Sequence, residues 1–282
     1  MTTADTARLL SLAAIWGASF LFMRIVAPVL GPVVTAELRT LIAGIGLALY
    51  FALIGLAGEW RLHARHYIIV GILSSAVPFL LWAYAALSLQ AGLLSVLNAT
   101  APMFGALCAA LILRERLSAR RVAGLVIGVA GVALVTRPDS DAALHYPAIA
   151  GALAACFCYG LVATYIKRWA NHVPSRKMAA GSQLAAGLLL MPLVPLWPPM
   201  APPTPLVIGS VLALGLVCSG IAYLLYFRLI ADIGATGALT VTYLIPVFGV
   251  LWGVLFLGET ISLSMLAGAA LVVLGTVFVL RT

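Results

Sequence analysis

The chain contains one apolar stretch twice, at a fixed separation of 144 residues. Residues 98–118 align with residues 242–262 without a gap, and 8 of the 21 positions are identical. Leucine matches alone carry little weight in so apolar a chain. A proline, a Phe-Gly pair, a glutamate and a serine that all keep one register are much harder to obtain by chance. The sequence therefore predicts one structural unit written twice.

The composition places this unit in a membrane. The chain of 282 residues is 64% hydrophobic and 9% charged, whereas a soluble domain carries about 25% charged residues. A spanning helix needs about 20 apolar residues, so the length accommodates about ten spans with their loops. Lipid offers no hydrogen bonds to the backbone, and the apolar runs are continuous rather than alternating, which favours helices over a barrel. We expect an all-α integral membrane protein with ten transmembrane helices.

The apolar runs give the expected positions of these helices. We expect helices over residues 8–27, 33–57, 67–88, 92–113, 120–137, 147–168, 175–197, 206–230, 235–257 and 263–281. The connections are short. The stretch 192–205 is rich in proline and uncharged, so it cannot be regular helix, and we expect it at a membrane surface.

Five helices in each half make an odd number, so the second half enters the membrane from the opposite side. The predicted halves, residues 1–141 and 142–282, therefore form two inverted five-helix repeats. Inverted repeats are typical of transporters, which hold substrate near mid-membrane and alternate access by moving one half against the other.

The net charge of +8 follows membrane topology rather than nucleic-acid binding, because the basic residues sit in short loops between apolar runs. With the N-terminus inside, 13 of the 16 Lys and Arg residues fall on the cytoplasmic side. The three exceptions are Arg24, Arg39 and Arg137. The positive-inside rule then predicts cytoplasmic termini, and the lipid bilayer is the expected macromolecular environment.

Several other function classes lack their sequence marks. The four cysteines lie inside apolar segments, and the pair Cys156 and Cys158 has no partner ligands nearby, so we expect no metal and no cofactor. No H-E-x-x-H, G-x-S-x-G or P-loop pattern occurs, which argues against a membrane enzyme. Nothing resembles a selectivity filter, although a channel stays an alternative.

Three runs of the sequence carry a family resemblance. IWGASFLFMRIV from Ile15, ELRTLIAGIGLAL from Glu37, and the segment from Trp82 to Ser118 resemble the drug/metabolite transporter superfamily, and the second copy does the same. The resemblance covers the whole chain and points to ten-helix EamA-type exporters of the bacterial inner membrane. Those that export aromatic amino acids are the nearest in pattern. The second half departs from the usual opening motif, with Cys156 to Gly160 in place of Trp-Gly.

Two aromatic stripes suggest the wall of a binding site. Ser75, Phe79 and Trp82 align with Ser219, Tyr223 and Tyr226, and spacings of four and three place each trio on one helical face. Trp16 and Tyr159 are equivalent under a shift of 143. We interpret all eight residues as substrate-binding candidates. The alternative is a packing stripe or an interfacial aromatic belt.

Polar groups next to two prolines form the second candidate element. Asn98 and Thr242 are equivalent, and each lies one turn before a proline, Pro102 or Pro246. A proline frees the carbonyl about four residues earlier and kinks the helix. We assign Asn98 and Thr242 to the substrate site and the two prolines to a hinge. A plain structural kink is the alternative.

The glycine-rich helices over 120–137 and 263–281 have a different role. Gly124, Gly128 and Gly131 align with a second helix that contains Gly268 and Gly275. Small residues at this spacing allow close approach in lipid. We interpret the two helices as packing or dimer surfaces away from the pathway, and a monomer is compatible with this.

The ionisable residues constrain the substrate. We expect no carboxylate, histidine or basic cluster at mid-depth, and Glu115 and Glu259 are interpreted as loop ties or helix caps. This argues against phosphate-bearing substrates, which need Arg or Lys clusters. The hypothesis is an exporter of amino acids with aromatic or other neutral, apolar side chains, and of related small metabolites. The alternative is a multidrug or lipophilic-cation exporter on the same scaffold.

Overall fold

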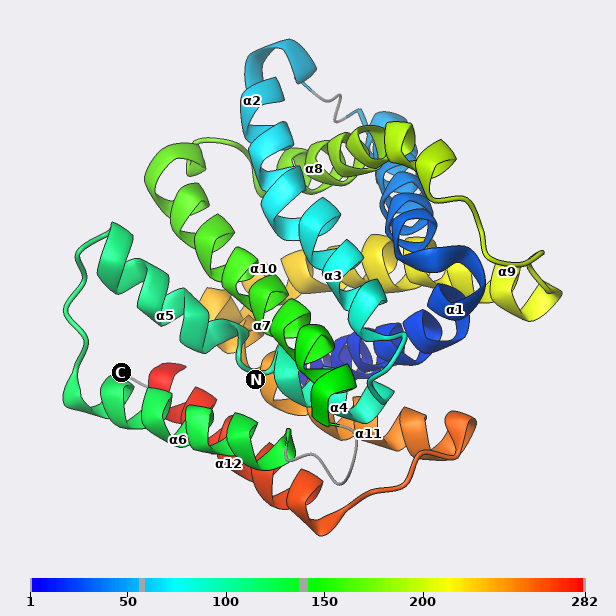
Figure 1. Ribbon diagram of the computed structural model, residues 1–282. Coiled ribbons are helices and arrows are strands. Elements are labelled where there is room, and N and C mark those ends of the chain that lie inside the picture. The colour runs from blue at the N-terminus through cyan, green and yellow to red at the C-terminus, as the bar shows by residue number, and fades with distance from the viewer. Residues whose placement is uncertain (1, 56–58, 137–141, 281–282) are drawn as a thin grey trace.

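A computed structural model describes residues 2–55, 59–136 and 142–280. Within these ranges the chain is helical and contains no β-strand (Figure 1). The predicted boundary between the halves, at residue 141, lies outside the described residues, as do Arg137 and Arg281 of the topology argument.

The α-helices run as follows: α1 Thr3–Leu53, α2 Trp60–Gly71, α3 Val77–Ala85, α4 Ala91–Asn98, α5 Ala101–Ile112, α6 Ala119–Val135, α7 Ala142–Tyr165, α8 Ser175–Leu190, α9 Pro205–Leu212, α10 Ala222–Ala238, α11 Val241–Leu257 and α12 Leu263–Leu280. Wide π-helical turns join several of them: η1 Ile72–Ala76, η2 Ile166–Ala170 and η4 Ala213–Ile221. A 3₁₀ segment, η3 Met191–Leu196, follows α8. Among the described residues, seven continuous helical stretches are long and apolar enough to cross a membrane, and α11 is a shorter apolar helix.

Helix α1 is bent into two arms, residues 3–30 and 32–53, by Gly31. Gly31 has φ 75° and ψ 162°, a backbone conformation that is energetically unfavourable for residues with a Cβ atom. A straight helix of 51 residues would be about 76 Å long, far more than the bilayer core of about 30 Å. The sequence predicts a connection over 28–32, but the structure keeps both arms helical up to Gly31 itself (Figure 1).

The proline-rich stretch closes this break. The backbone N–H groups of Met200 and Ala201 donate to the carbonyl of Val29 at 2.9 and 3.1 Å. A helix end inside lipid needs such partners for its last carbonyls. The prediction that this stretch contains no regular α-helix is confirmed up to Thr204, since α9 begins at Pro205, and the stretch caps the first arm of α1.

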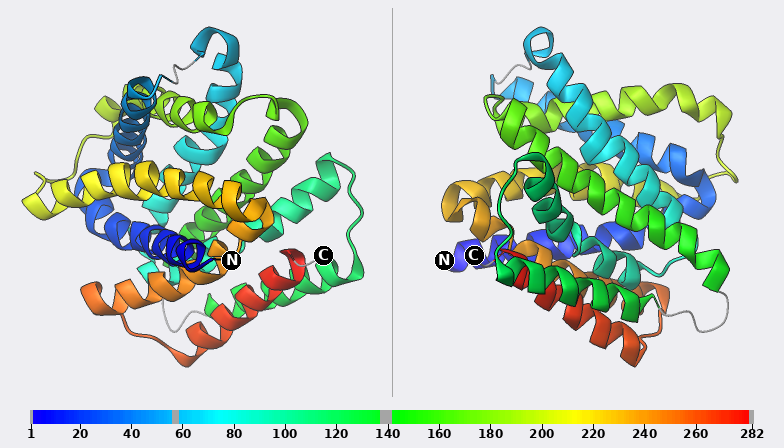
Figure 2. Two further views of the ribbon diagram at one scale, coloured as in Figure 1. Left: turned by 180° about the vertical axis from the view of Figure 1, so that it is seen from behind. Right: turned by 60° about the vertical axis from the view of Figure 1, so that its left-hand side comes forward.

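Helices α6 and α12 pack tightly along their glycines. A Cβ atom on Gly124 would lie 2.6 Å from the carbonyl oxygen of Gly275, so no larger side chain fits there. Figure 2 shows the two helices side by side at one edge of the molecule. The small residues predicted to form packing or dimer surfaces thus face each other within one chain.

Helix α2 begins seven residues earlier than the sequence predicts, at Trp60 rather than at residue 67. His63 and His66 therefore lie on a helix, where the sequence predicts a loop. Their rings lie 5.8 and 5.1 Å from that of His172, so three of the four histidines gather at one end of the molecule.

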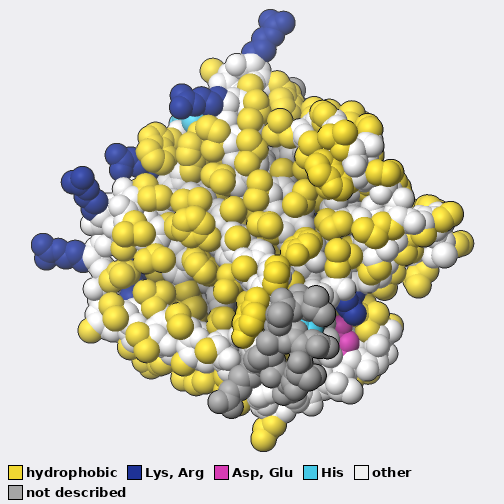
Figure 3. All heavy atoms as spheres, in the orientation of Figure 1, with side chains coloured by type: hydrophobic (Ala, Val, Ile, Leu, Met, Phe, Trp, Pro, Cys, Tyr) yellow, Lys and Arg dark blue, Asp and Glu magenta, His cyan; other side chains and the backbone are white. Residues whose placement is uncertain are grey.

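The outer surface is strongly apolar. Side chains such as Val126, Leu255 and Leu212 are 65%, 62% and 46% exposed, and apolar atoms dominate the face in Figure 3, where Lys and Arg gather along one edge. Exposed apolar surface of this extent marks contact with lipid rather than with water. The molecule is a multi-pass membrane protein.

Candidate functional site

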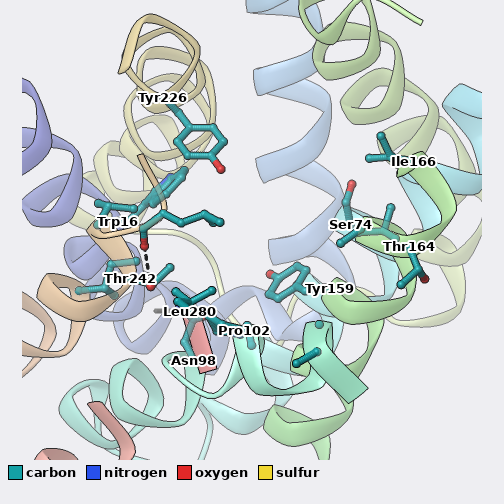
Figure 4. Close-up of a pocket in the computed structure, with 18 of the residues that line it drawn as sticks. Trp16, Ser74, Asn98, Pro102, Tyr159, Thr164, Ile166, Tyr226, Thr242 and Leu280 are labelled. Carbon is teal, nitrogen blue, oxygen red and sulfur yellow. Dashed lines mark hydrogen bonds between the residues drawn. The ribbon is translucent and has the colours of Figure 1, made fainter. Parts of the chain in front are cut away.

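A cavity of about 630 Å³ lies between the helices. Its wall is mainly apolar and includes the aromatic side chains of Trp16, Phe79, Trp82, Tyr159, Tyr223 and Tyr226. Asn98, Ser219 and Thr242 add polar groups to the lining. Figure 4 shows Tyr159 facing Trp16 and Tyr226 across the open space, with Asn98 and Pro102 between the two sides. Nine of the ten predicted substrate residues therefore come together around one space.

Ser75 is the exception. It is fully buried behind the wall, and its hydroxyl lies 3.0 Å from that of Ser74, which lines the cavity instead. The spacing argument assumes α-helix, but Ser75 belongs to the π-turn η1. A π-turn inserts an extra residue into the helix, which changes the faces of the residues before it relative to Phe79, and Ser74 is the serine that reaches the cavity.

The π-turns recur at equivalent places in the two halves. Adding 144 to the bounds of η1 gives residues 216–220, which lie inside η4. Both turns contribute to the lining, through Ser74 in η1 and through Cys218 and Ser219 in η4. Such wide turns are frequent at functional sites.

The aromatic wall is held by ring contacts. Trp16 lies 5.3 Å from Tyr226, and Trp82 lies 5.3 Å from Phe20 in an edge-to-face arrangement. These distances match favourable aromatic pairs. Trp82 is 1% exposed, so it packs into the core as well as lining the cavity.

Arg39 also lines the cavity, a placement that the sequence analysis missed. Its side chain is buried, its Nε donates to the Ser219 hydroxyl at 2.9 Å, and its guanidinium carbon lies 3.8 Å from the centroid of Phe79. Among the described residues, no carboxylate lies within ion-pair distance of it. The sequence analysis placed Arg39 toward the outer side and did not count it among the cavity residues, so its place in the cavity wall is new. An arginine inside an apolar run is the signal that could have found it.

One end of the cavity is charged and open. Glu115, Arg121 and Lys167 line it there. Lys167 pairs with Glu115, and its side chain is 67% exposed, so this end reaches the surface. The hydrogen bond and charge of Lys167 hold the pKa of Glu115 below its usual range.

Glu259 binds the N-terminus of α4, at the opposite end of the α4–α5 segment from Glu115. The carboxylate of Glu259 accepts hydrogen bonds from the backbone N–H groups of Ala91 and Gly92 at 2.7 and 3.1 Å, with Arg24 4.0 Å away. Residues 91–112 lie between this cap and Glu115, a path of about 33 Å if helical. Neither Glu259 nor Arg24 lines the cavity. Glu259 is expected to tie a loop or cap the helix that follows it, but it caps α4, which lies in the other predicted half of the sequence.

The two prolines differ in their surroundings. Pro102 follows a break between α4 and α5, whereas α11 continues through Pro246. At the break, Thr276 donates its hydroxyl to the carbonyl of Ala99 at 2.7 Å, which replaces a lost helical hydrogen bond. Pro102 lines the cavity and Pro246 is buried beside it. Within the described residues, no group of three potential ligands could hold a metal ion.

Comparison with known proteins identifies the fold and the family. The sequence model of the EamA-like transporter family matches residues 7–137 and again residues 146–281. An uncharacterized transporter of Archaeoglobus fulgidus is 26% identical over 94% of this chain and 95% of its own. The uncharacterized transporter YvbV of Bacillus subtilis is 26% identical over 95% of this chain and 89% of its own.

One further relative matches about two thirds of this chain, and one solved structure matches nearly all of it. A probable terminal-alkyne amino-acid exporter of Streptantibioticus cattleyicolor is 27% identical over 68% of this chain and 64% of its own. One solved crystal structure of a protein shares the fold, with a TM-score of 0.67 and 21% identity over 99% of this chain and 96% of that chain.

Proposed function

The chain belongs to the EamA-like transporter family, and on this premise we propose that it exports amino acids with aromatic or other neutral side chains across the bacterial inner membrane. Transport would proceed by alternating access through the cavity described above. The observation that carries the proposal is the cavity itself: a space of about 630 Å³, mostly apolar and with several aromatic side chains in its wall, that is open beside Lys167. Such apolar spaces with a few polar groups suit small amphipathic ligands.

The proposal includes ten crossings in two inverted halves. The length of α1 and its break at Gly31 support two crossings within this one element. The family model matches the chain twice, once in each predicted half, which supports the duplication. The start of α1 and the end of α12 lie on the same side of the molecule (Figure 2), as cytoplasmic termini require.

The proposed roles of the residues follow from their places in the cavity. The aromatic residues would contact the apolar part of the substrate, and Asn98, Ser219 and Thr242 would supply hydrogen bonds. Pro102 and Pro246 would mark the place where the two halves bend. The break before Pro102 supports a bend in the first half, whereas the continuous α11 makes Pro246 the weaker candidate.

A lipophilic cation is the alternative substrate. Its support is the aromatic wall, since aromatic faces attract cations. The described lining, however, carries three cationic side chains, Arg39, Arg121 and Lys167, and one anionic side chain, Glu115. This excess of positive charge repels a cation and favours a substrate with a carboxylate. The distant amino-acid exporter points the same way.

Counterflow in proteoliposomes tests the proposal. Vesicles are loaded with unlabelled phenylalanine, and a trace of labelled phenylalanine, methionine or threonine is added outside without an ion gradient. We expect transient accumulation of label that outside competitors abolish, with phenylalanine ahead of threonine. Folded protein that accumulates no amino acid but exchanges a lipophilic cation such as tetraphenylphosphonium would contradict the proposal and support the alternative.

A further inference from the structure

Arg39 brings a positive charge to the cavity wall, and no carboxylate among the residues that the structure describes forms an ion pair with it. Its side chain is 5% exposed, and the carboxylate that lines the described part of the cavity, Glu115, is already paired with Lys167 at the open end. Removing a cation from water without a counter-ion is unfavourable, and intramembrane arginines are retained for function. We therefore looked for the group that could supply a counter-ion to the Arg39 guanidinium.

The contacts of the guanidinium leave one edge free for such an ion. One face lies on the ring of Phe79, and Nε donates to Ser219. Nη1 lies 4.0 Å from the sulfur of Met23, which is a weak acceptor. The group is thus oriented on one face and at one corner, while the edge formed by its two Nη atoms has no strong acceptor among the described residues. Two parallel N–H groups of this kind match the two oxygens of a carboxylate.

We propose that Arg39 is the carboxylate receptor of the cavity and that a carboxylate is the obligatory recognition group of the substrate. This inference rests on the proposed export of amino acids and names the part of the molecule that is recognised. The substrate carboxylate pairs with the Nη edge of Arg39. The side chain of the substrate then lies near Tyr159 and Tyr223, which line the same cavity as Arg39.

This arrangement recognises the carboxylate of an amino acid more strongly than its ammonium group. No carboxylate among the described residues stands beside Arg39 to receive an ammonium group. Removal of the amino group therefore costs little affinity, whereas removal or neutralisation of the carboxylate removes the main contact. A deaminated acid is a better ligand than the matching amine.

Equilibrium binding to the purified full-length protein in lipid nanodiscs tests this preference. The readout is fluorescence, since Trp16 and Trp82 line the cavity. The ligands are phenylalanine, 3-phenylpropanoate, 2-phenylethylamine and phenylalaninamide. We expect the two carboxylates to bind with affinities within about tenfold of each other, and the amine and the amide to bind at least about 30-fold more weakly.

Substitutions at Arg39 locate the discrimination. Arg39→Gln should abolish the preference for carboxylates, and Arg39→Lys should keep a weakened preference, because an ammonium supplies a charge without the planar fork. The matched control is Arg228→Gln, at an exposed position outside the cavity, which should bind all four ligands like the wild type.

The outcomes separate this inference from the function on which it rests. Phenylalanine and phenylalaninamide bound equally well by the wild type would overturn the inference and leave amino-acid transport intact. The same holds for an Arg39→Gln variant that binds phenylalanine and keeps the full preference. Binding of 3-phenylpropanoate without phenylalanine would support the receptor and overturn amino-acid export. No binding of any ligand by folded wild-type protein would overturn both.

Discussion

Trp82 belongs both to the cavity wall and to the most deeply buried side chains of the molecule. It is 1% exposed and packs edge-on against Phe20, so a substitution there affects folding as well as binding. Tyr226 is only half-buried and meets Trp16 from the other side of the cavity. The two positions therefore separate the structural from the ligand-binding contribution of the wall.

We predict that Trp82→Ala lowers the free energy of unfolding by about 3–5 kcal/mol, because it leaves a large void, and that Tyr226→Ala costs less. Both variants should slow phenylalanine counterflow. Thermal unfolding in detergent and counterflow at equal protein density measure the two effects. An unchanged counterflow rate for Tyr226→Ala would remove Tyr226 from the proposed substrate site.

Glu259 and Glu115 are equivalent in the repeat but differ in their partners. We predict that Glu259→Ala destabilises the protein by about 1–3 kcal/mol, because it strands the buried N–H groups of Ala91 and Gly92. Glu115→Ala removes a surface ion pair, with side chains 34% and 67% exposed, and should cost about 0–1 kcal/mol. Equal losses in unfolding experiments would argue against the cap at α4.

The pair of Glu115 and Lys167 gives a small pH dependence. Because Lys167 lowers the pKa of Glu115 in the folded protein, the pair stabilises the fold above the ordinary glutamate pKa. This contribution disappears as the pH falls through the lowered value. We predict that Lys167→Met reduces stability at pH 7 by less than about 1 kcal/mol and has no effect once Glu115 is protonated. Melting temperatures between pH 7 and pH 3 measure the difference, and a variant that loses more at low pH would contradict it.

The sequence predicted some of the cavity-lining residues and missed others. The repeat and the helical spacing predicted nearly all aromatic members, because both depend on local periodicity. Arg39 was missed because its surroundings come from three distant segments, with Ser219 from η4, Phe79 from α3 and Met23 from the first arm of α1. The sequence shows Arg39 within an apolar run, but it does not show that the side chain of Arg39 lines the cavity.

At the scale of elements, α1 depends on one backbone conformation. We predict that Gly31→Ala destabilises the protein by about 1–3 kcal/mol, because φ 75° with ψ 162° is a conformation that residues with a Cβ atom rarely adopt. A Cβ there meets only Met200 at 3.9 Å, so the cost is conformational rather than steric. The control is Gly209→Ala in α9, where a Cβ meets nothing within 4 Å and should be neutral or slightly stabilising. Equal melting temperatures for the two variants would contradict this account of the bend.

The positions of helices were predictable, and their irregularities were not. Each predicted helix falls on helical structure, because long apolar runs leave lipid-exposed backbone little choice. The π-turns η1 and η4 escaped prediction because an extra residue in a turn leaves no mark in an apolar sequence. One consequence is the exchange of Ser75 for Ser74 at the cavity.

At the scale of the whole molecule, the cavity connects the repeat to transport. Residues from both predicted halves line its wall, and one end is open beside Lys167. Closing of the open end and opening of the opposite end would carry a bound ligand across the membrane. The proposed function therefore requires that this cavity hold the transported molecule.

Protection of a cavity cysteine by substrate is the most direct test of that claim. In a variant without the four native cysteines that retains counterflow, Ala109→Cys places a thiol on the cavity lining, and Ala119→Cys places one at an exposed site outside it. A membrane-impermeant maleimide then reports access in proteoliposomes. We predict that phenylalanine slows modification at position 109 but not at 119, and that modification at 109 stops counterflow. Unchanged modification at 109 while counterflow proceeds would place the transport site elsewhere.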